Sequence, residues 1–208
     1  MKPNKEILIV GGTGFIGYHL AKRCLKEGWK VTSISTNKPK KIRYLKKIRY
    51  LIFDITKKKN LSKLLRHNFS HVVNLGGYVN HTNKIKTYNS NYLGCKNLTE
   101  VFLNKSLKTF VQIGSSSEYG NLSSPQKESN KCKPKLTYGK SKLLATKHLI
   151  SLNKEKSFPS VVLRLYQAFG PAQDLNRFMP IIISGCLKDK KFPCSEGTQF
   201  RDFIYVED

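Results

Sequence analysis

Short apolar segments alternate with amphipathic segments along most of this chain. The apolar segments are rich in β-branched side chains and bounded by turn residues, which is typical of buried strands. The expected strands are residues 6–10, 30–34, 49–53, 71–75, 109–113 and 160–165. Apolar positions at helical spacing predict helices at residues 15–27, 61–67, 84–105 and 138–152. Strands that alternate with helices predict an α/β fold built on a doubly wound parallel sheet.

The pattern changes after residue 170. The segment LNRFMPIIISGCLKDKKF predicts one more helix that leads into a short strand, and the sequence then ends in the apolar-rich stretch FRDFIYVED. We therefore expect residues 1–170 to form one domain and residues 171–208 to begin a smaller, incomplete second domain.

Three glycines follow the first expected strand in the stretch ILIVGGTGFIG: Gly11, Gly14 and Gly17. Glycine is favoured where the backbone turns tightly, where a phosphate approaches the main chain, and where a helix packs closely on a sheet. A helix that opens after such a turn presents free N–H groups and the positive end of its dipole to a pyrophosphate. The stretch therefore predicts a dinucleotide-binding turn.

The composition adds a strong positive charge without choosing a partner. Lys and Arg number 38 against 13 acidic residues, a formal net charge of +25, which attracts polyanions of any kind. No apolar run approaches the roughly 18 residues of a membrane helix, and the run before the glycines is too short for a signal peptide. We expect a cytoplasmic protein with no membrane partner. The five cysteines lack CxxC spacing and a histidine partner, so we expect reduced thiols and no metal site.

The stretch LTYGKSK places Tyr138 and Lys142 four residues apart, on one face of an expected helix. A nearby ammonium group stabilises a phenolate and so lowers the pKa of a tyrosine. The pair is therefore a candidate for proton transfer to or from a hydroxyl or carbonyl group. His81, beside the fourth expected strand, is expected to be a pocket-wall or surface residue rather than a catalytic one.

Together these motifs resemble the extended branch of the short-chain dehydrogenase/reductase superfamily, which contains NAD(P)-dependent nucleotide-sugar epimerases, dehydratases and reductases. The GxxGxxG spacing, the serine run in FVQIGSSSEYG and the YxxxK pair follow one another in the order of that family. Counting back from Gly120, the resemblance makes Ser115 the catalytic serine that acts with Tyr138 and Lys142. It also implies a Rossmann-type fold and a C-terminal substrate domain.

The end of the second expected strand bears on the choice of cofactor. An NAD site usually carries an acidic residue there, whereas this chain has Ser35, Thr36, Asn37 and Lys38. Hydroxyls and a lysine suit a 2′-phosphate, so we favour NADP(H), with NAD(H) possible. The resemblance implies that Asp54 meets the adenine amino group. It implies cofactor contacts at Gly11, Gly14, Phe15, Ile16, Gly17, Thr36, Asn37, Lys38, Asp54, Ile55, Leu75, Asn91, Tyr138 and Lys142.

The hexapeptide KKIRYL occurs twice in succession, starting at Lys40 and at Lys46. Lys40, Lys41 and Arg43 follow the end of the second expected strand. We interpret the basic stretch as a cofactor-phosphate edge, then a solvated Lys/Arg turn with Lys46 and Lys47 at the surface, and then a core strand. Binding of nucleic acid by the same residues is the alternative. No specific nucleic-acid partner is expected.

The resemblance implies a nucleotide-diphosphate sugar as the substrate and places it against Ser115, Ser116, Gln167 and Arg201. Arg201 lies in RDFIYVED, which resembles the segment whose arginine contacts the diphosphate, and a guanidinium fork suits that group. Sugar dehydratases of this family carry an acidic residue at the positions of Ser116 and Ser117. A serine hydroxyl is too weak an acid to supply that base, so dehydration is disfavoured.

We therefore expect an oxidoreductase that acts at C4 of a nucleotide sugar. A preference for NADP favours a 4-ketosugar reductase, because NADPH supplies net reducing power, and an NAD-dependent 4-epimerase is the enzymatic alternative. A non-catalytic nucleic-acid-binding or regulatory protein of the same fold and an inactive remnant are the alternatives of other classes. The intact Tyr/Lys pair counts against the non-catalytic protein. Members of the resembled family commonly form homodimers through two helices per subunit, here residues 84–105 and 138–152.

Overall fold

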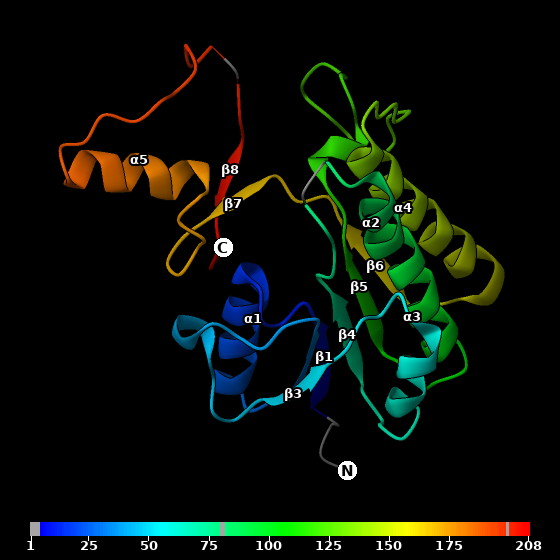
Figure 1. The fold of residues 1–208 in the computed structure, drawn as a ribbon. Helices are drawn as coiled ribbons and strands as arrows, with labels where there is room; N and C mark the ends of the chain where they lie inside the picture. The colour runs from blue at the N-terminus through cyan, green and yellow to red at the C-terminus, as the bar shows by residue number, and fades with distance from the viewer. Residues whose placement is uncertain (1–4, 80–81, 199) are drawn as a thin grey trace.

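The computed structural model describes residues 5–79, 82–198 and 200–208, so that His81 lies outside the described residues. Six parallel strands form one sheet in the order β3-β2-β1-β4-β5-β6 (Figure 1). They are β1 (Glu6–Val10), β2 (Lys30–Ser35), β3 (Arg49–Ile52), β4 (His71–Asn74), β5 (Thr109–Ile113) and β6 (Ser160–Leu163). All six expected strands form, and the last of them ends at Leu163 rather than at residue 165. The predicted doubly wound α/β sheet is confirmed.

The strand order places the glycine turn at a crevice. The chain runs from β1 outward to β2 and β3, and then returns to the other side of β1 for β4, β5 and β6. The order reverses between β1 and β4, and ligands of such sheets bind outside the carboxyl ends of the strands at this reversal. Gly11 follows β1 and Leu75 follows β4, so both lie at this point.

Helices cover both faces of the sheet (Figure 1). They are α1 (Phe15–Lys26), α2 (Lys84–Tyr88), α3 (Gly94–Phe102) and α4 (Thr137–Lys156). Ile7 and Ile9 of β1 pack in the core beneath α1, whereas Leu8 and Val10 pack in the core beneath α3 and α4. Because both faces are buried, the strands appear in the sequence as continuous apolar runs rather than as alternating ones.

Two of the expected helices differ from the prediction. The segment expected as a helix at residues 61–67 forms a 3₁₀ helix, Lys58–Leu64. The helix expected over residues 84–105 is interrupted by a π-helical turn, Asn89–Leu93, which separates α2 from α3. Within the described residues, no helix is long and apolar enough to cross a membrane.

The C-terminal part forms a small lobe beyond the carboxyl ends of the sheet (Figure 1). It contains β7 (Gln167–Phe169), α5 (Phe178–Leu187) and β8 (Phe203–Tyr205). The strand expected directly after the helix does not form in residues 188–198; instead β8 pairs in parallel with β7, which was not predicted. The strand β7 precedes residue 170, and the expected domain boundary stays a prediction.

Candidate active site

The turn between β1 and α1 depends on its glycines. Gly11 has a φ of +81°, a region that favours glycine, and its N–H donates to the carbonyl oxygen of Ile34 at 2.7 Å. A Cβ on Gly17 would overlap the carbonyl oxygen of Gly11, so the first turn of α1 packs directly on the glycine turn. Gly14 caps α1 without a side-chain hydrogen bond. The first N–H groups of the helix therefore lie beside the crevice uncovered by a capping side chain, an arrangement that fits a pyrophosphate.

A cavity of about 730 Å³, here called the adenosine end, runs from the glycine turn across the carboxyl ends of β2 and β3. Thr36, Asn37, Asp54 and Ile55 line it, as the sequence predicted for cofactor-binding residues. Lys38 is exposed and is not part of this lining. Among the described lining residues Asp54 is the only carboxylate, so the end of β2 presents no negative charge to a ribose phosphate.

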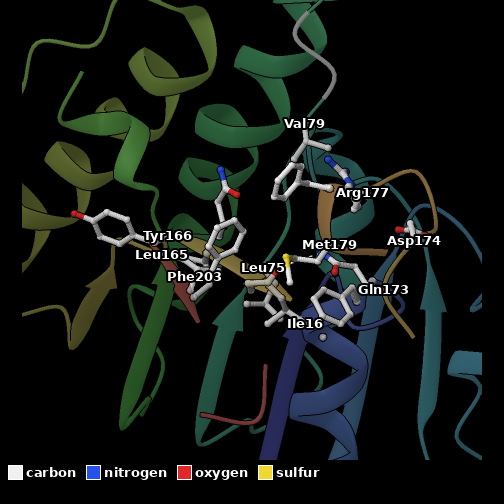
Figure 2. A pocket seen from close by; sticks show the side chains of 18 of the residues that line it. Ile16, Leu75, Val79, Leu165, Tyr166, Gln173, Asp174, Arg177, Met179 and Phe203 are labelled. Carbon is white, nitrogen blue, oxygen red and sulfur yellow. Dashed lines mark hydrogen bonds between the residues drawn. The ribbon is translucent and has the colours of Figure 1, made fainter. Parts of the chain in front are cut away.

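A second cavity, of about 610 Å³, shares Gly11, Gly14 and Leu75 with the adenosine end, and we call it the catalytic end. Tyr138 lines it together with the first residues of α1, Phe15, Ile16 and Gly17. Figure 2 shows the side chains of Leu75, Met179 and Phe203 gathered around this space, which the sheet and the C-terminal lobe enclose between them. The two cavities adjoin at these shared residues, and we refer to them together as the cleft.

The three expected catalytic residues meet at the inner wall of the catalytic end. Tyr138 and Lys142 lie near the start of α4, and Ser115 follows β5. The side chains of Ser115 and Tyr138 share a hydrogen bond. Lys142 Nζ donates to the carbonyl oxygen of Ile113 at 2.9 Å and lies 5.9 Å from the centre of the Tyr138 ring. Ser115 does not line the cavity itself; it lies behind the tyrosine, with 8% of its surface exposed.

Burial is the largest influence on the pKa values of this wall. Burial raises the pKa of Tyr138 above its ordinary value, and the hydrogen bond from Ser115 and the charge of Arg177 act in the opposite direction. The charge of Glu118 also raises this pKa, and the expected lowering by Lys142 stays a prediction. Burial lowers the pKa of Lys142 itself to about 8, against the charge of Glu118.

Asn91 supports the catalytic helix from behind the cleft. It is fully buried in the π-helical turn, and π-helical turns frequently mark functional sites. Its Nδ2 donates to Ser141 Oγ at 3.1 Å, and Ser141 Oγ donates to the carbonyl oxygen of Tyr138 at 2.9 Å. Its Oδ1 accepts from the N–H of Tyr78 at 3.3 Å. Asn91 lines neither end of the cleft and therefore connects α4 to the loop after β4 rather than facing the cofactor space.

Glu118, the carboxylate closest in sequence to the serine run, is fully buried. Its Oε1 accepts from the N–H of Ser115 at 2.8 Å, and its Oε2 accepts from Thr146 Oγ1 at 2.8 Å and from Arg164 Nε at 3.1 Å. These bonds fix the turn that holds Ser115. The carboxylate is used inside the protein and does not line the cleft, so it is not placed to act on a sugar.

The expected substrate residues Ser116, Gln167 and Arg201 line a third cavity, of about 490 Å³, here called the substrate-side cavity. They come from the turn after β5, from β7 and from the stretch before β8. Tyr166 and Gln167 line both this cavity and the catalytic end, so the two spaces adjoin. The structure thus brings together residues that are far apart in the sequence in a cavity that adjoins the catalytic end and shares no lining residue with the adenosine end.

The basic stretch is not divided as expected. Arg43, which was expected beside the cofactor-phosphate edge, is only 4% exposed. Its Nε and Nη2 donate to the carbonyl oxygen of Ala172 at 2.9 and 2.7 Å, and its Nη2 lies 3.0 Å from Asp174 Oδ1. Lys40 Nζ lies 2.6 Å from the same Oδ1. A buried guanidinium needs such partners, so these two basic residues bind the C-terminal lobe and are not part of the cleft lining.

The sequence analysis missed a group of cleft residues in the C-terminal lobe. They are Gln173, Asp174, Arg177, Phe178 and Met179. Their stretch, before and at the start of α5, was recognised only as helical. Its contact with the catalytic end depends on how the lobe folds back over the cleft, and no local motif reports that. Within the described residues there is no cluster of His, Cys, Asp or Glu that could hold a metal ion.

Comparison with known proteins decides the family. The model of the NAD dependent epimerase/dehydratase family matches residues 7–208. This chain belongs to that family. The resemblance to extended short-chain dehydrogenases/reductases that the motifs indicated is thereby confirmed. In this family member those motifs form the glycine turn and the group of Ser115, Tyr138 and Lys142.

Curated relatives of this family member include enzymes named for nucleotide-linked sugars, and also sterol-4-alpha-carboxylate 3-dehydrogenases such as that of Homo sapiens, which is 25% identical over 98% of this chain and 55% of its own length. The CDP-abequose synthase of Salmonella muenchen is 28% identical over 99% of this chain and 67% of its own length. The dTDP-6-deoxy-L-talose 4-dehydrogenase (NAD(P)(+)) of Kitasatospora kifunensis is 32% identical over 81% of this chain and 54% of its own length. The chain thus spans between about half and two thirds of the length of these relatives.

Solved structures show the same fold. A mutant UDP-glucuronic acid 4-epimerase of Bacillus cereus, in complex with NAD and UDP-4-deoxy-4-fluoro-glucuronic acid, matches with a TM-score of 0.87 and 26% identity, over 97% of this chain and 69% of its own. The UDP-glucose 4-epimerase of Thermotoga maritima matches with a TM-score of 0.90 and 21% identity over 97% of this chain and 70% of its own, a likeness of fold alone.

Proposed function

We propose that this chain forms the cofactor-binding and catalytic part of a nucleotide-sugar oxidoreductase that acts at the sugar C4, most favourably as an NADPH-dependent 4-ketosugar reductase. One observation carries the proposal: Tyr138, hydrogen-bonded to Ser115, lines the same cleft as the glycine turn. A proton-transfer group and a pyrophosphate site therefore open into one space, as a dinucleotide-dependent reaction at a carbonyl or hydroxyl requires.

Each residue of the site would have a separate role in this reaction. The turn of Gly11, Gly14 and Gly17 would hold the pyrophosphate of the cofactor, and the bound nicotinamide supplies or accepts the hydride. Tyr138 would hold the proton at its phenolic oxygen and pass it to, or take it from, the oxygen on C4. Ser115 would orient that oxygen through its hydroxyl group. The buried ammonium of Lys142 holds the end of β5 through the carbonyl oxygen of Ile113.

The preference for NADP and for reduction is part of the proposal. It is supported by the absence of a carboxylate at the end of β2 among the described lining residues of the adenosine end and by the relative named as a 4-dehydrogenase with NAD(P)(+). The corresponding observation for a 4-epimerase is the 26% identical UDP-glucuronic acid 4-epimerase with bound NAD. The 4-epimerase is therefore the second candidate.

A 4,6-dehydratase is disfavoured on geometric grounds. One relative, 29% identical, is the dTDP-D-glucose 4,6-dehydratase of Dictyostelium discoideum. In this chain, however, Ser116 and Ser117 line the substrate-side cavity, and Glu118 is turned inward to Ser115, Thr146 and Arg164. The described residues of that cavity include Asp202 as their only carboxylate, and it comes from the C-terminal lobe rather than from the serine run.

The substrate would be a nucleotide-diphosphate sugar that enters from the C-terminal lobe. Arg201 lines the substrate-side cavity and Arg177 the catalytic end. Both residues are exposed, and a guanidinium group suits a diphosphate.

A homodimer and a cytoplasmic location belong to the same proposal. Leu144 at 39% and Ile150 at 47% are exposed apolar side chains of α4, one of the two helices expected at the dimer contact. The cysteines of the described residues carry no disulfide, which suits a reducing compartment.

The Tyr138→Phe substitution tests the assigned chemistry. The variant keeps the ring and loses the proton-transfer group, so turnover should fall by about 10²- to 10⁴-fold. The formation of reduced nicotinamide from added NADP+ or NAD+ would be followed with UDP-glucose, UDP-glucuronic acid and dTDP-6-deoxy-L-talose as probes, because oxidation of their C4 hydroxyl is the reverse of the proposed reduction. Affinity for NADPH should stay within about twofold, because the glycine turn is untouched.

The matched control is Tyr88→Phe, which removes a phenol group from the half-exposed surface of α2. It should turn over like the parent chain. Equal activity of the Tyr138 and Tyr88 variants would contradict the role of Tyr138. A parent chain that binds NADPH and converts none of the probes would contradict the proposed substrate class.

A further inference from the structure

The segment at residues 171–174 crosses from the small lobe back to the cofactor-binding sheet and is fastened there at two separate places. At the first, Arg43 donates to the carbonyl oxygen of Ala172 and pairs with Asp174, which also pairs with Lys40. At the second, His19 Nε2 lies 2.8 Å from the carbonyl oxygen of Pro171. His19 belongs to α1, and Lys40 and Arg43 belong to the turn after β2.

These contacts differ from ordinary surface ion pairs because two of the side chains that make them are buried. Arg43 is 4% exposed and His19 is 8% exposed, so both have given up water for their partners in the lobe. The hydrogen bond from Lys40, joined by that from Arg43, holds the pKa of Asp174 below its ordinary value. Ala172 has a φ of +61°, a left-handed conformation that a non-glycine residue adopts at a cost, and the contacts on both sides of it maintain that conformation.

The fastened segment forms one wall of the catalytic end of the cleft. Gln173 and Asp174 line that end directly, and Arg177 and Phe178 follow at the start of α5. In Figure 2, Gln173, Asp174 and Arg177 lie on the same side of the pocket. The adenosine end, by contrast, has no lining residue from 165 onward among the described residues. The C-terminal lobe therefore forms part of the catalytic end of the cleft and no part of the described lining of the adenosine end.

We propose that Arg43 is a positioning residue whose bonds to Ala172 and Asp174 hold the C-terminal lobe closed over the catalytic end of the cleft. The inference rests on the proposed dinucleotide site and adds its regulation: the lobe can close over the nicotinamide half of a cofactor only while this contact holds. A ligand that needs the closed state binds more weakly in proportion to the fraction of molecules that is open. A ligand confined to the adenosine end does not sense the contact.

The experiment compares two probes on the full chain by calorimetric titration: NADPH, which spans both ends of the cleft, and ADP, which reaches only the adenosine end and the glycine turn. Arg43→Met removes charge-assisted hydrogen bonds and should weaken NADPH binding by about tenfold or more, with ADP affinity unchanged within about twofold. Asp174→Asn, a milder change that leaves the bonds to Ala172, should weaken NADPH binding less. Arg43→Lys should restore part of the NADPH affinity.

Lys46→Met is the matched control, because Lys46 lies three residues after Arg43, is exposed and carries the same charge. It should leave both affinities unchanged, which accounts for long-range electrostatics. Equal loss of NADPH and ADP affinity in both the Arg43→Met and Asp174→Asn variants would overturn the proposal and give the contact a purely structural role. Unchanged NADPH affinity in both variants would overturn it as well. A parent chain that binds ADP but not NADPH would instead contradict the proposed dinucleotide site.

Discussion

Lys142 carries its charge in a position where water cannot solvate it. Its side chain is 4% exposed, and burial lowers its pKa from 10.5 to about 8. The neighbouring charges of Glu118 and Cys95 act in the opposite direction without restoring the ordinary value. Cys95 is itself buried, with a pKa raised to about 12, so the ammonium has Glu118 as its only charged neighbour at neutral pH among the groups that act on it.

This lysine should leave a signature in the pH dependence of stability. Between the folded pKa of about 8 and the ordinary value of 10.5, the unfolded state binds more protons than the folded state, so the free energy of unfolding rises with pH in that window. Below about pH 8 both states are protonated and the penalty is constant. Lys142→Met should abolish this contribution. Across the window, the free energy of unfolding of the parent chain should rise relative to that of the variant by on the order of 3 kcal/mol.

Urea unfolding at a series of pH values, followed by the fluorescence of Trp29, would measure this difference. Lys140→Met provides the control, because Lys140 is an exposed residue of the same helix and should not change the slope. A Lys142 variant whose stability runs parallel to that of the parent chain from about pH 7 to pH 10.5 would show that the buried lysine titrates normally.

At the scale of elements, the close packing of α1 on the glycine turn leaves no room for a side chain at Gly17. A Cβ on Gly17 would overlap the carbonyl oxygen of Gly11 and approach the Cα of Gly12, both backbone atoms that cannot move aside cheaply. Gly17→Ala should therefore displace the start of α1, cost about 1–3 kcal/mol of stability, and weaken dinucleotide binding by at least about tenfold.

Calorimetric titration and thermal unfolding of Gly17→Ala would be compared with those of Lys22→Ala, an exposed site on the same helix. Because alanine has a high helix propensity, the control should be at least as stable as the parent chain. A Gly17→Ala variant that binds NADPH as tightly as the parent chain would show that the start of α1 does not contact the cofactor.

The elements of the sheet could be predicted from the sequence because each strand is a local apolar run between turn residues. The π-helical turn was not predicted, because no residue type in the sequence of residues 84–105 marks it. Its Asn91 contacts Ser141 and the loop after β4. The strands β7 and β8 are short, and they form only because segments far apart in sequence pair. Such pairing has no local signal.

The candidate site likewise contains residues that a local motif marks and residues whose position depends on contacts between distant segments. Tyr138 and Lys142 were singled out by their spacing on one helix face, and Ser115 was implied by the family resemblance. The structure brings the three together, and their catalytic roles stay a proposal. Arg43 was misplaced because its partners, Ala172 and Asp174, lie about 130 residues away. A lysine-rich turn looks solvated in the sequence whether or not one of its members is buried.

At the scale of the whole molecule, the net charge of +25 and the cleft make separable contributions to binding. Charge spread over the surface attracts any polyanion, and salt screens it over about 8 Å at physiological ionic strength. A shaped cleft selects its ligand and keeps it when the surface field is screened. Binding at physiological salt therefore distinguishes a dinucleotide enzyme from a nucleic-acid-binding protein of the same fold.

The most direct test of the central claim is a calorimetric titration of the purified chain with NADPH and with NADH at physiological salt, with a short DNA duplex in parallel. The cleft built on Gly11, Gly14 and Gly17 predicts saturable binding of one molecule of dinucleotide per chain, tighter for NADPH, and DNA binding that salt removes. Failure to bind either dinucleotide, together with DNA binding that survives physiological salt, would contradict the assignment of the cleft to a cofactor.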